Sequence, residues 1–188
     1  MASYEFFKAS LEAAEGGYQK LVNDKGNYNS KGELVGTNHG VSAKFYETII
    51  GRPPSEEDMR SLTKVEAHIL FKNEFWDKIS ADEIQSQAVA EVVADHAINA
   101  NPRVTAKIVQ RVLNKYFGMN LSVDGAIGAK TLEAINSVNA DKLFQYIAEA
   151  RLDYYSRLKD YKYFAKSWTS RVYALGEKFG VEIKKKRR

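Results

Sequence analysis

The chain has 188 residues, of which 44% are hydrophobic and 12% aromatic, and it contains no Cys. This composition supplies enough apolar surface for a packed core and excludes intrinsic disorder for most of the chain. The absence of Cys excludes disulfides, thiolate nucleophiles, iron–sulfur clusters and the usual structural zinc sites. The net charge of +4 comes from five basic residues at 184–188, and without them the chain has one more acidic than basic residue. A nucleic-acid-binding surface is therefore not expected.

The N-terminal part is predicted to form one helix followed by a polar stretch. Apolar residues recur at helical spacing from 6 to 14, and two glycines follow Glu15. We therefore expect a helix of about three turns that ends at Glu15. From residue 19 to residue 38, Asn, Gly, Ser, Asp and Tyr dominate without a helical period, which predicts loops and a short irregular hairpin.

The rest of the chain is predicted to be helical. Capping residues, Pro at first helical positions and Gly at ends mark the boundaries, as do capping-box patterns at Ser55 with Asp58, Thr63 with Glu66 and Ser80 with Glu83. The expected helices cover residues 42–50, a short stretch from 55, then 63–78, 80–100, 102–118, 131–138, 139–158 and 165–179. A boundary at Pro102 separates a region of residues 1–100 from one of residues 101–180, with a basic tail at 181–188. The helices on both sides of that boundary are apolar enough to share a core.

Two acidic residues near the polar stretch are candidates for acid catalysis. Glu15 is expected in the last turn of a helix, where the helix dipole disfavours ionisation and favours the protonated form that a general acid needs. Asp24 follows nine positions later in a loop. Glycosidases use two oxygen-bearing groups that flank the scissile bond. Taken alone, each residue is also compatible with a structural role, as an exposed Glu or a turn-forming Asp.

A hydroxyl residue, Thr37, precedes the next predicted helix. It can orient a water molecule, or it can satisfy the backbone of a turn. Aromatic rings supply flat faces on which sugars stack, and Tyr18 and Tyr28 lie in the loop region, where they are expected to line a groove.

Three segments together resemble a known family: Glu15 to Tyr18, Asn23 to Gly26, and Gly36 to Ser42. They are similar to the N-terminal signature of glycoside hydrolase family 108, the peptidoglycan-cleaving lysozymes of bacteria and their phages. The resemblance implies a mainly α, lysozyme-like helical fold with a short loop and β-hairpin region near residues 19–40.

The resemblance also implies the roles of the site residues. Glu15 is the proton donor, Asp24 stabilises positive charge or polarises water, and Thr37 helps to hold that water. Ser30 stands where the spacing usual in phage-type lysozymes would place the threonine, so it is the alternative to Thr37. Asn38, which belongs to the third segment, is expected to contact substrate.

The second half resembles the predicted peptidoglycan-binding module that accompanies this family. The resemblance rests on Asp95 to Asn99, Lys107 to Leu113 and Val123 to Gly128, and it extends to Val172. Asn99 is expected to contact substrate. Within the second segment, Gln110 and Arg111 either bond a glycan strand or belong to a solvated helix face.

The resulting hypothesis is an N-acetylmuramidase that cleaves the β-1,4 bond between N-acetylmuramic acid and N-acetylglucosamine by acid-assisted attack of water. Inverting and retaining routes both stay open. One alternative is a non-catalytic peptidoglycan-binding or secretion-associated protein. Another is a lytic transglycosylase, which leaves an anhydro end and needs no Asp24. His39, His68 and His96 lack paired metal-ligand spacing, so neither a metal nor a cofactor is expected.

The expected partner is the glycan strand of peptidoglycan, with no nucleic acid, no stable membrane insertion and a monomeric state. Neither a signal-peptide core nor an uninterrupted apolar run of about 18 residues is present. We therefore expect synthesis in the bacterial cytoplasm without a cleaved signal peptide and action in the periplasm or cell wall, as for an endolysin or prophage enzyme. The basic tail is expected to raise encounter with the anionic wall.

Overall fold

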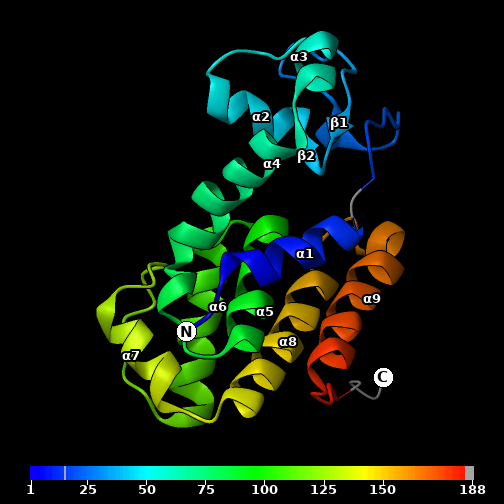
Figure 1. Cartoon of the computed structure of the whole chain (residues 1–188). Helices are drawn as coiled ribbons and strands as arrows, with labels where there is room; N and C mark the ends of the chain where they lie inside the picture. Colours follow the sequence, from blue (N-terminus) through cyan, green and yellow to red (C-terminus); the bar gives the residue numbers. More distant parts are fainter. Residues whose placement is uncertain (15, 185–188) are drawn as a thin grey trace. The chain divides into compact units, whose positions relative to one another are not determined.

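The computed structural model describes residues 1–14 and 16–184 (Figure 1). Helices contain 66% of the residues, and the described residues form nine α-helices and one two-stranded antiparallel hairpin. This confirms the prediction of a mainly helical fold with a short hairpin. Glu15, the expected proton donor, and residues 185–188 of the predicted tail lie outside the described residues.

The chain divides into two compact units. The smaller unit comprises residues 5–72, and the larger one comprises residues 1–4 and 73–188. This division differs from the boundary predicted at 100/101, because the helix of residues 87–100 packs within the larger unit. The sequence already indicated that the helices on both sides of that boundary are apolar enough to share a core.

The smaller unit contains four helices and the hairpin, in the order α1 (Tyr4–Ala14), a 3₁₀ turn (Lys25–Asn27), β1 (Thr37–Asn38), β2 (Val41–Ser42), α2 (Ala43–Ile50), α3 (Glu56–Ser61) and α4 (Lys64–Phe71). Val35, Ala43 and Met59 form a buried cluster in this unit. The hairpin turn has positive φ at His39 (47°) and Gly40 (77°), as a tight two-residue turn requires. The hairpin lies at the C-terminal end of the stretch for which it was predicted.

Helix caps explain where the helices of the smaller unit begin. Ser55 forms a capping box with Asp58, and Thr63 forms one with Glu66, as the sequence predicts. The N-cap of α2 is Ser42, whose Oγ accepts a hydrogen bond from the backbone of Phe45. The polar stretch between α1 and α2 is therefore followed by three helices with fixed starting points.

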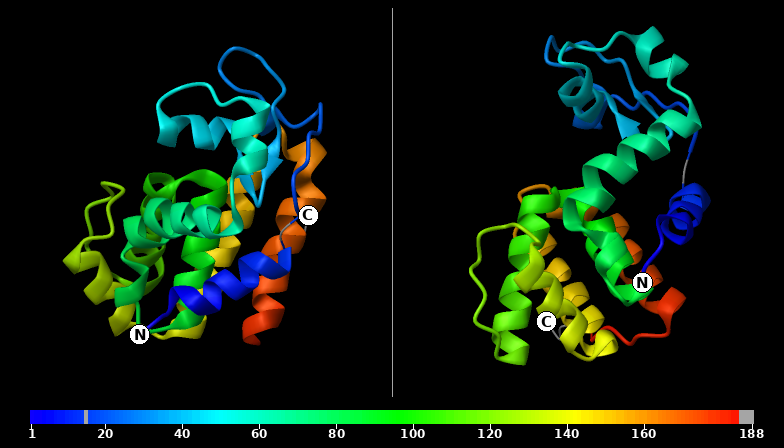
Figure 2. Two further views of the ribbon diagram at one scale, coloured as in Figure 1. Left: turned by 45° about the horizontal axis from the view of Figure 1, so that its top comes forward. Right: turned by 60° about the vertical axis from the view of Figure 1, so that its left-hand side comes forward.

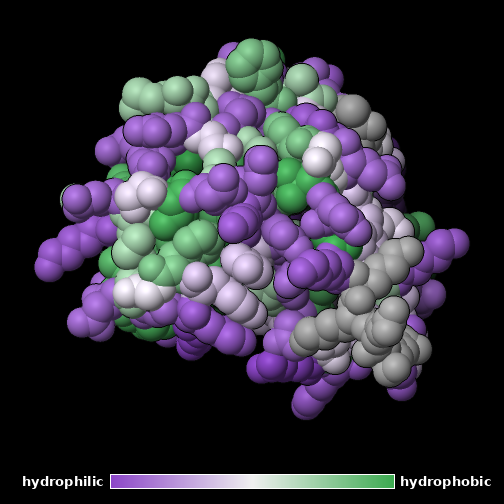
Figure 3. Space-filling view, turned by 90° about the horizontal axis from the view of Figure 1, so that it is seen from below, coloured by the Kyte–Doolittle hydropathy of each residue, from purple (hydrophilic) through white to green (hydrophobic). Residues whose placement is uncertain are grey.

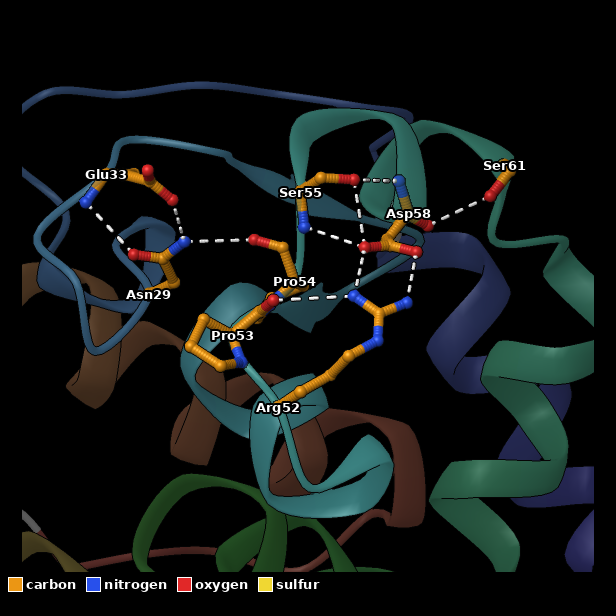
Figure 4. A network of polar contacts seen from close by, with 8 residues as sticks. All are labelled: Asn29, Glu33, Arg52, Pro53, Pro54, Ser55, Asp58 and Ser61. Carbon is orange, nitrogen blue, oxygen red and sulfur yellow. Dashed lines mark hydrogen bonds and ion pairs between the residues drawn. The ribbon is translucent and has the colours of Figure 1, made fainter.

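A polar network holds the connection between α2 and α3 (Figure 4). Both Nη atoms of Arg52 donate to the carboxylate of Asp58, at 2.7 and 2.8 Å. The amide of Asn29 donates to the carbonyl of Pro54 at 3.0 Å and to the carboxylate of Glu33 at 2.7 Å. The polar loop of residues 29–33 is thus tied to the helices that follow it.

After α4, the chain continues into the larger unit through a π-helical segment (Lys72–Trp76) and two 3₁₀ turns (Asp77–Ile79 and Ala81–Glu83). Two predicted helices, 63–78 and 80–100, are therefore wrong in part. The first ends at Phe71 as an α-helix. The second begins only at Gln87, because Ser80 adopts a left-handed conformation and Ser86 supplies the N-cap instead.

The remaining helices of the larger unit are α5 (Gln87–Ala100), α6 (Pro102–Phe117), α7 (Ala129–Ser137), α8 (Ala140–Ser156) and α9 (Tyr161–Phe179). In the larger unit α6, α8 and α9 pack against α5, and α7 packs against α6 and α8. α5 contacts α6 and α8 most extensively, and α8 lies beside α9 in both views of Figure 2. The last helix starts four residues before its predicted start at 165.

A buried ionic cluster joins three of these helices. The carboxylate of Asp95 on α5 accepts hydrogen bonds from Arg151 on α8 and from Arg171 on α9. Arg151 is fully buried and also donates to the carbonyl of Val92 at 3.1 Å. The two guanidinium groups hold the pKa of Asp95 below its usual range although burial alone would raise it. Asp95 therefore stays ionised and neutralises charge inside the helical core.

The surface in the view of Figure 3 is mostly hydrophilic, and apolar side chains are exposed in small groups between the charged ones. Within residues 1–14 and 16–184, no helix combines the length and the apolar character needed to cross a membrane.

Candidate active site

Asp24 begins the tight turn that leads into the candidate site. It is the N-cap of the 3₁₀ turn, and its Oδ1 accepts a hydrogen bond from the N–H of Gly26 at 2.8 Å. A Cβ at Gly26 would lie 3.1 Å from Oδ1 of Asp24 and 3.3 Å from Cβ of Ser42. Glycine at this position therefore lets the backbone of the turn lie close both to the carboxylate of Asp24 and to the residue that caps α2.

Thr37 lies in β1 and is tied to the same turn. Its hydroxyl donates to Oδ1 of Asn27 at 2.5 Å, and its backbone exchanges two hydrogen bonds with Gln19, at 2.8 and 2.9 Å. Asn27 in turn donates its N–H to the carbonyl of Asp24 at 3.1 Å. A chain of hydrogen bonds thus connects the hydroxyl of Thr37 with the turn that Asp24 begins.

The centre of this arrangement is a pair of amide side chains that sequence reasoning missed. Asn27 is fully buried; its Nδ2 donates to Oε1 of Gln19 at 3.0 Å, and Nε2 of Gln19 donates back to Oδ1 of Asn27 at 3.2 Å. Nδ2 of Asn27 also donates to the carbonyl of Leu21 at 3.0 Å. Because Asn is common in turns, no sequence signal distinguishes this buried Asn from an exposed one.

Ser30, the alternative to Thr37, lies in a different part of the smaller unit. It is exposed, in the loop closed by the bridge between Tyr28 and Leu34. Its backbone N–H donates to the carboxylate of Glu47 at 2.8 Å. The turn of Asp24 is therefore connected to Thr37 through hydrogen bonds, whereas the backbone of Ser30 is hydrogen-bonded to a side chain of α2.

The two tyrosines expected to line a groove are both partly buried, and their rings have different neighbours. The hydroxyl of Tyr18 donates to the carbonyl of Val35 at 2.9 Å, and the guanidinium of Arg60 lies 3.9 Å from the centre of its ring. One face of Tyr18 is thus already covered by a cation. Tyr28 is half-buried, and its hydroxyl donates to the carbonyl of Val22 at 3.0 Å.

Asn38 and Asn99, both expected to contact substrate, use their amide nitrogens inside the protein. Asn38 is only 4% exposed, and its Nδ2 donates to carbonyls at the end of α3, with the shortest distance, 2.9 Å, to Met59. Asn99 lies in the larger unit, where its Nδ2 donates to the carbonyl of Asp95 at 2.7 Å. Asn38 therefore supports α3 from β1, and Asn99 supports the end of α5.

The histidines have separate surroundings. His39 is in the hairpin turn, His68 lies 3.2 Å from the carboxylate of Glu12, and Nδ1 of the buried His96 lies 2.9 Å from the hydroxyl of Thr105. Burial lowers the pKa of His96 to about 3, so this side chain is neutral at physiological pH. Across the part of the chain that the structure describes, no three His, Asp or Glu side chains gather as ligands of a metal ion would.

A pH-dependent ion cluster supports Tyr18 through Arg60. Hydrogen bonds from Lys20 and Arg60 lower the pKa of Glu56 from 4.5 to about 2. Because the folded-state pKa is depressed, this contribution to stability is present above about pH 4.5 and is lost as the pH falls towards 2. We expect the thermal unfolding midpoint of Glu56→Gln to fall less than that of wild type over this pH range.

The matched control for this experiment is Glu57→Gln, which removes one carboxylate from the same helix. Its unfolding midpoint is expected to follow the wild-type pH profile. An unchanged acid dependence in Glu56→Gln would show that the cluster does not contribute to acid stability.

Comparison with known proteins agrees with this architecture. Residues 9–100 match the family described as glycosyl hydrolase 108, and residues 104–173 match a family described as a predicted peptidoglycan domain. The chain therefore carries a glycoside hydrolase domain followed by a peptidoglycan domain, which implies hydrolysis of peptidoglycan. More specifically, the first of these is a glycosyl hydrolase 108 domain and the second is a C-terminal predicted peptidoglycan-binding domain.

A solved structure is similar in fold over nearly the whole chain. The structure of Brucella abortus SagA superposes with a TM-score of 0.81 at 28% sequence identity, covering 95% of this chain and 97% of that chain. No curated protein matches the sequence. The two family matches meet between residues 100 and 104, whereas the compact units meet between 72 and 73. By sequence, α5 thus belongs to the hydrolase domain, although it packs in the larger unit.

Proposed function

We propose that the protein is a lysozyme that hydrolyses the β-1,4 bond between N-acetylmuramic acid and N-acetylglucosamine in peptidoglycan. The observation that carries this proposal is the turn of Asp24 and Asn27, hydrogen-bonded to Thr37, within a glycosyl hydrolase 108 domain. Hydrogen bonds thus connect the turn that carries the carboxylate of Asp24 with the hydroxyl of Thr37, and both residues follow Glu15 in the chain.

Each residue has a distinct role in the proposed reaction. Glu15 protonates the oxygen of the leaving sugar as the glycosidic bond breaks. One oxygen of Asp24 is held by the N–H of Gly26, and the carboxylate faces the positive charge that develops at the anomeric carbon or the water that attacks it. Thr37 orients that water. An inverting reaction requires about 6.5–9.5 Å between the two carboxyl groups, and a retaining one requires about 5 Å.

Thr37 is predicted to be the more important of the two hydroxyl residues. We expect Thr37→Ala to lower the rate of peptidoglycan hydrolysis about 10-fold, the effect of one lost hydrogen bond, because the water then loses a fixed partner. Ser30→Ala, the matched control, is expected to retain the wild-type rate. Initial rates of reducing-end release measure both. A larger loss in Ser30→Ala would transfer the role to Ser30.

Two assays on the same wall preparation distinguish the proposed enzyme from a non-catalytic binding or secretion-associated protein. Co-sedimentation with purified peptidoglycan measures binding, and a reducing-sugar assay measures cleavage. The proposal predicts both binding and new reducing ends. Binding with neither new reducing ends nor anhydro ends would show a non-catalytic binding protein that has kept the hydrolase fold.

The proposed site of action is the periplasm or cell wall of a bacterium, with the protein made in the cytoplasm as a monomer, as for an endolysin or prophage enzyme. The peptidoglycan domain supports this location, because its ligand lies there. Nucleic acid is not a proposed partner. Cell fractionation with an antibody against the chain tests the location, and a protein found only in the cytoplasm of growing and lysing cells would contradict it.

A further inference from the structure

Helix α6 carries a row of basic residues. Arg103, Lys107, Arg111 and Lys115 occur at every fourth position, and the helix contains no acidic residue. Positions four apart lie on neighbouring points of one helix face, so the four charges follow one side of α6. None of them takes part in an ion pair among the described residues, whereas Arg157, the C-cap of α8, pairs with Asp153.

The two halves of this row have different surroundings. A Cβ at Gly125 would lie 2.7 Å from Cγ of Arg103 and 3.2 Å from Cε of Lys107, so these two side chains pack along the loop before α7. Arg111 and Lys115 instead line a groove of about 400 Å³ between α6 and α8. Both residues are exposed, so their charged groups are accessible along this groove.

The groove combines charges with apolar and aromatic surface. Ile108 and Val112 from α6 line it, together with Tyr116 and Tyr154. Tyr116 stacks on Tyr146 with ring centres 4.1 Å apart, which fixes its orientation. Such a surface suits an extended chain that carries small apolar groups between charged ones.

One acidic residue limits what the groove can bind. Glu149 from α8 lines the wall opposite Arg111, and Asp153 on the same helix is neutralised by Arg157. A uniform polyanion would be repelled by Glu149, whereas a ligand with both carboxylates and an amine would find partners on both walls.

We propose that this groove binds the peptide stems of peptidoglycan, with stem carboxylates held by Arg111 and Lys115. The proposal rests on the proposed function, since it assigns a ligand site to the peptidoglycan domain of that enzyme. Stem peptides carry free carboxylates, small methyl side chains and, where they are not cross-linked, an amine. Charge-assisted hydrogen bonds to the two cations would supply affinity, and the apolar lining would take the methyl groups.

The test compares binding of full-length variants to two wall preparations by co-sedimentation. One is intact peptidoglycan sacculi, and the other is sacculi whose stems have been removed by an amidase. All proteins carry Glu15→Gln and are kept on ice to suppress hydrolysis. We expect Arg111→Gln with Lys115→Gln to weaken binding to intact sacculi about 10-fold or more and to leave binding to stem-free glycan unchanged.

The matched control is Lys130→Gln with Lys142→Gln, which removes the same charge from exposed positions on α7 and α8. This pair is expected to bind like the parent protein. An equal loss in the control, an equal loss on stem-free glycan, or equally tight binding of the parent protein to duplex DNA would each overturn the proposal.

Hydrolysis by the wild-type catalytic site is measured separately. If it yields no new reducing ends, the proposed lysozyme function fails, whereas unaltered binding of the groove variant together with normal hydrolysis overturns only the groove assignment.

Discussion

Glu15→Gln is expected to lower the rate of peptidoglycan hydrolysis by about 10²–10⁴-fold without loss of the folded structure. The substitution keeps the shape of the side chain but removes the proton that the leaving oxygen needs. Because peptidoglycan binding does not depend on this proton, the variant should still co-sediment with the wall. Turbidity clearing of a wall suspension measures the rate, and thermal unfolding confirms the fold.

Glu5→Gln is the matched control for this variant. It makes the same chemical change on α1, at an exposed position 3.7 Å from the amine of Lys8. Its activity is expected to equal that of wild type. A Glu15→Gln protein that keeps more than about a hundredth of the wild-type rate would contradict the acid role, since proton transfer from a positioned group contributes at least that factor.

Asp95→Ala is expected to lower the free energy of unfolding by about 3–5 kcal/mol. The substitution leaves the guanidinium of Arg151 fully buried without its carboxylate partner. A buried charge without a counter-ion is far more costly than the loss of an exposed pair. Urea unfolding, followed by circular dichroism, measures the change.

Arg171→Gln serves as the comparison, because it removes the other partner of Asp95. The Arg171 side chain is 39% exposed, so solvent screens its contribution and the loss is expected to be below about 1 kcal/mol. Similar losses in Asp95→Ala and Arg171→Gln would show that the buried position of Arg151 does not decide the stability of the cluster.

Local sequence signals predicted most helix starts in this protein. The capping boxes at Ser55 and Thr63 have their predicted partners, and Asn139 caps α8 through the backbone of Lys142. The two partners of each contact are three positions apart, so both can be read from one short stretch of sequence. The prediction failed at Ser80, where a similar pattern occurs but tertiary structure places the residue in a left-handed turn.

The order of the candidate site residues along the chain was predictable, but the buried hydrogen bonds that connect them were not. The resemblance named Asp24 and Thr37, yet the buried pair of Gln19 and Asn27 that connects them depends on a fold that brings positions 19, 27 and 37 together. Asn38 shows the opposite case. It belongs to the same sequence segment as Thr37, but alternation along β1 turns its side chain inward, onto the end of α3.

In the proposed reaction, Glu15 protonates the leaving oxygen and a water molecule held near Asp24 and Thr37 breaks the glycan strand. Mass spectrometry of the fragments released from purified peptidoglycan tests this reaction most directly, with Glu15→Gln as the control. We predict fragments that end in reducing N-acetylmuramic acid, carry the mass of one added water, and are absent from the Glu15→Gln digest. Fragments that end in anhydro-N-acetylmuramic acid, or reducing fragments released equally by Glu15→Gln, would contradict the proposed reaction.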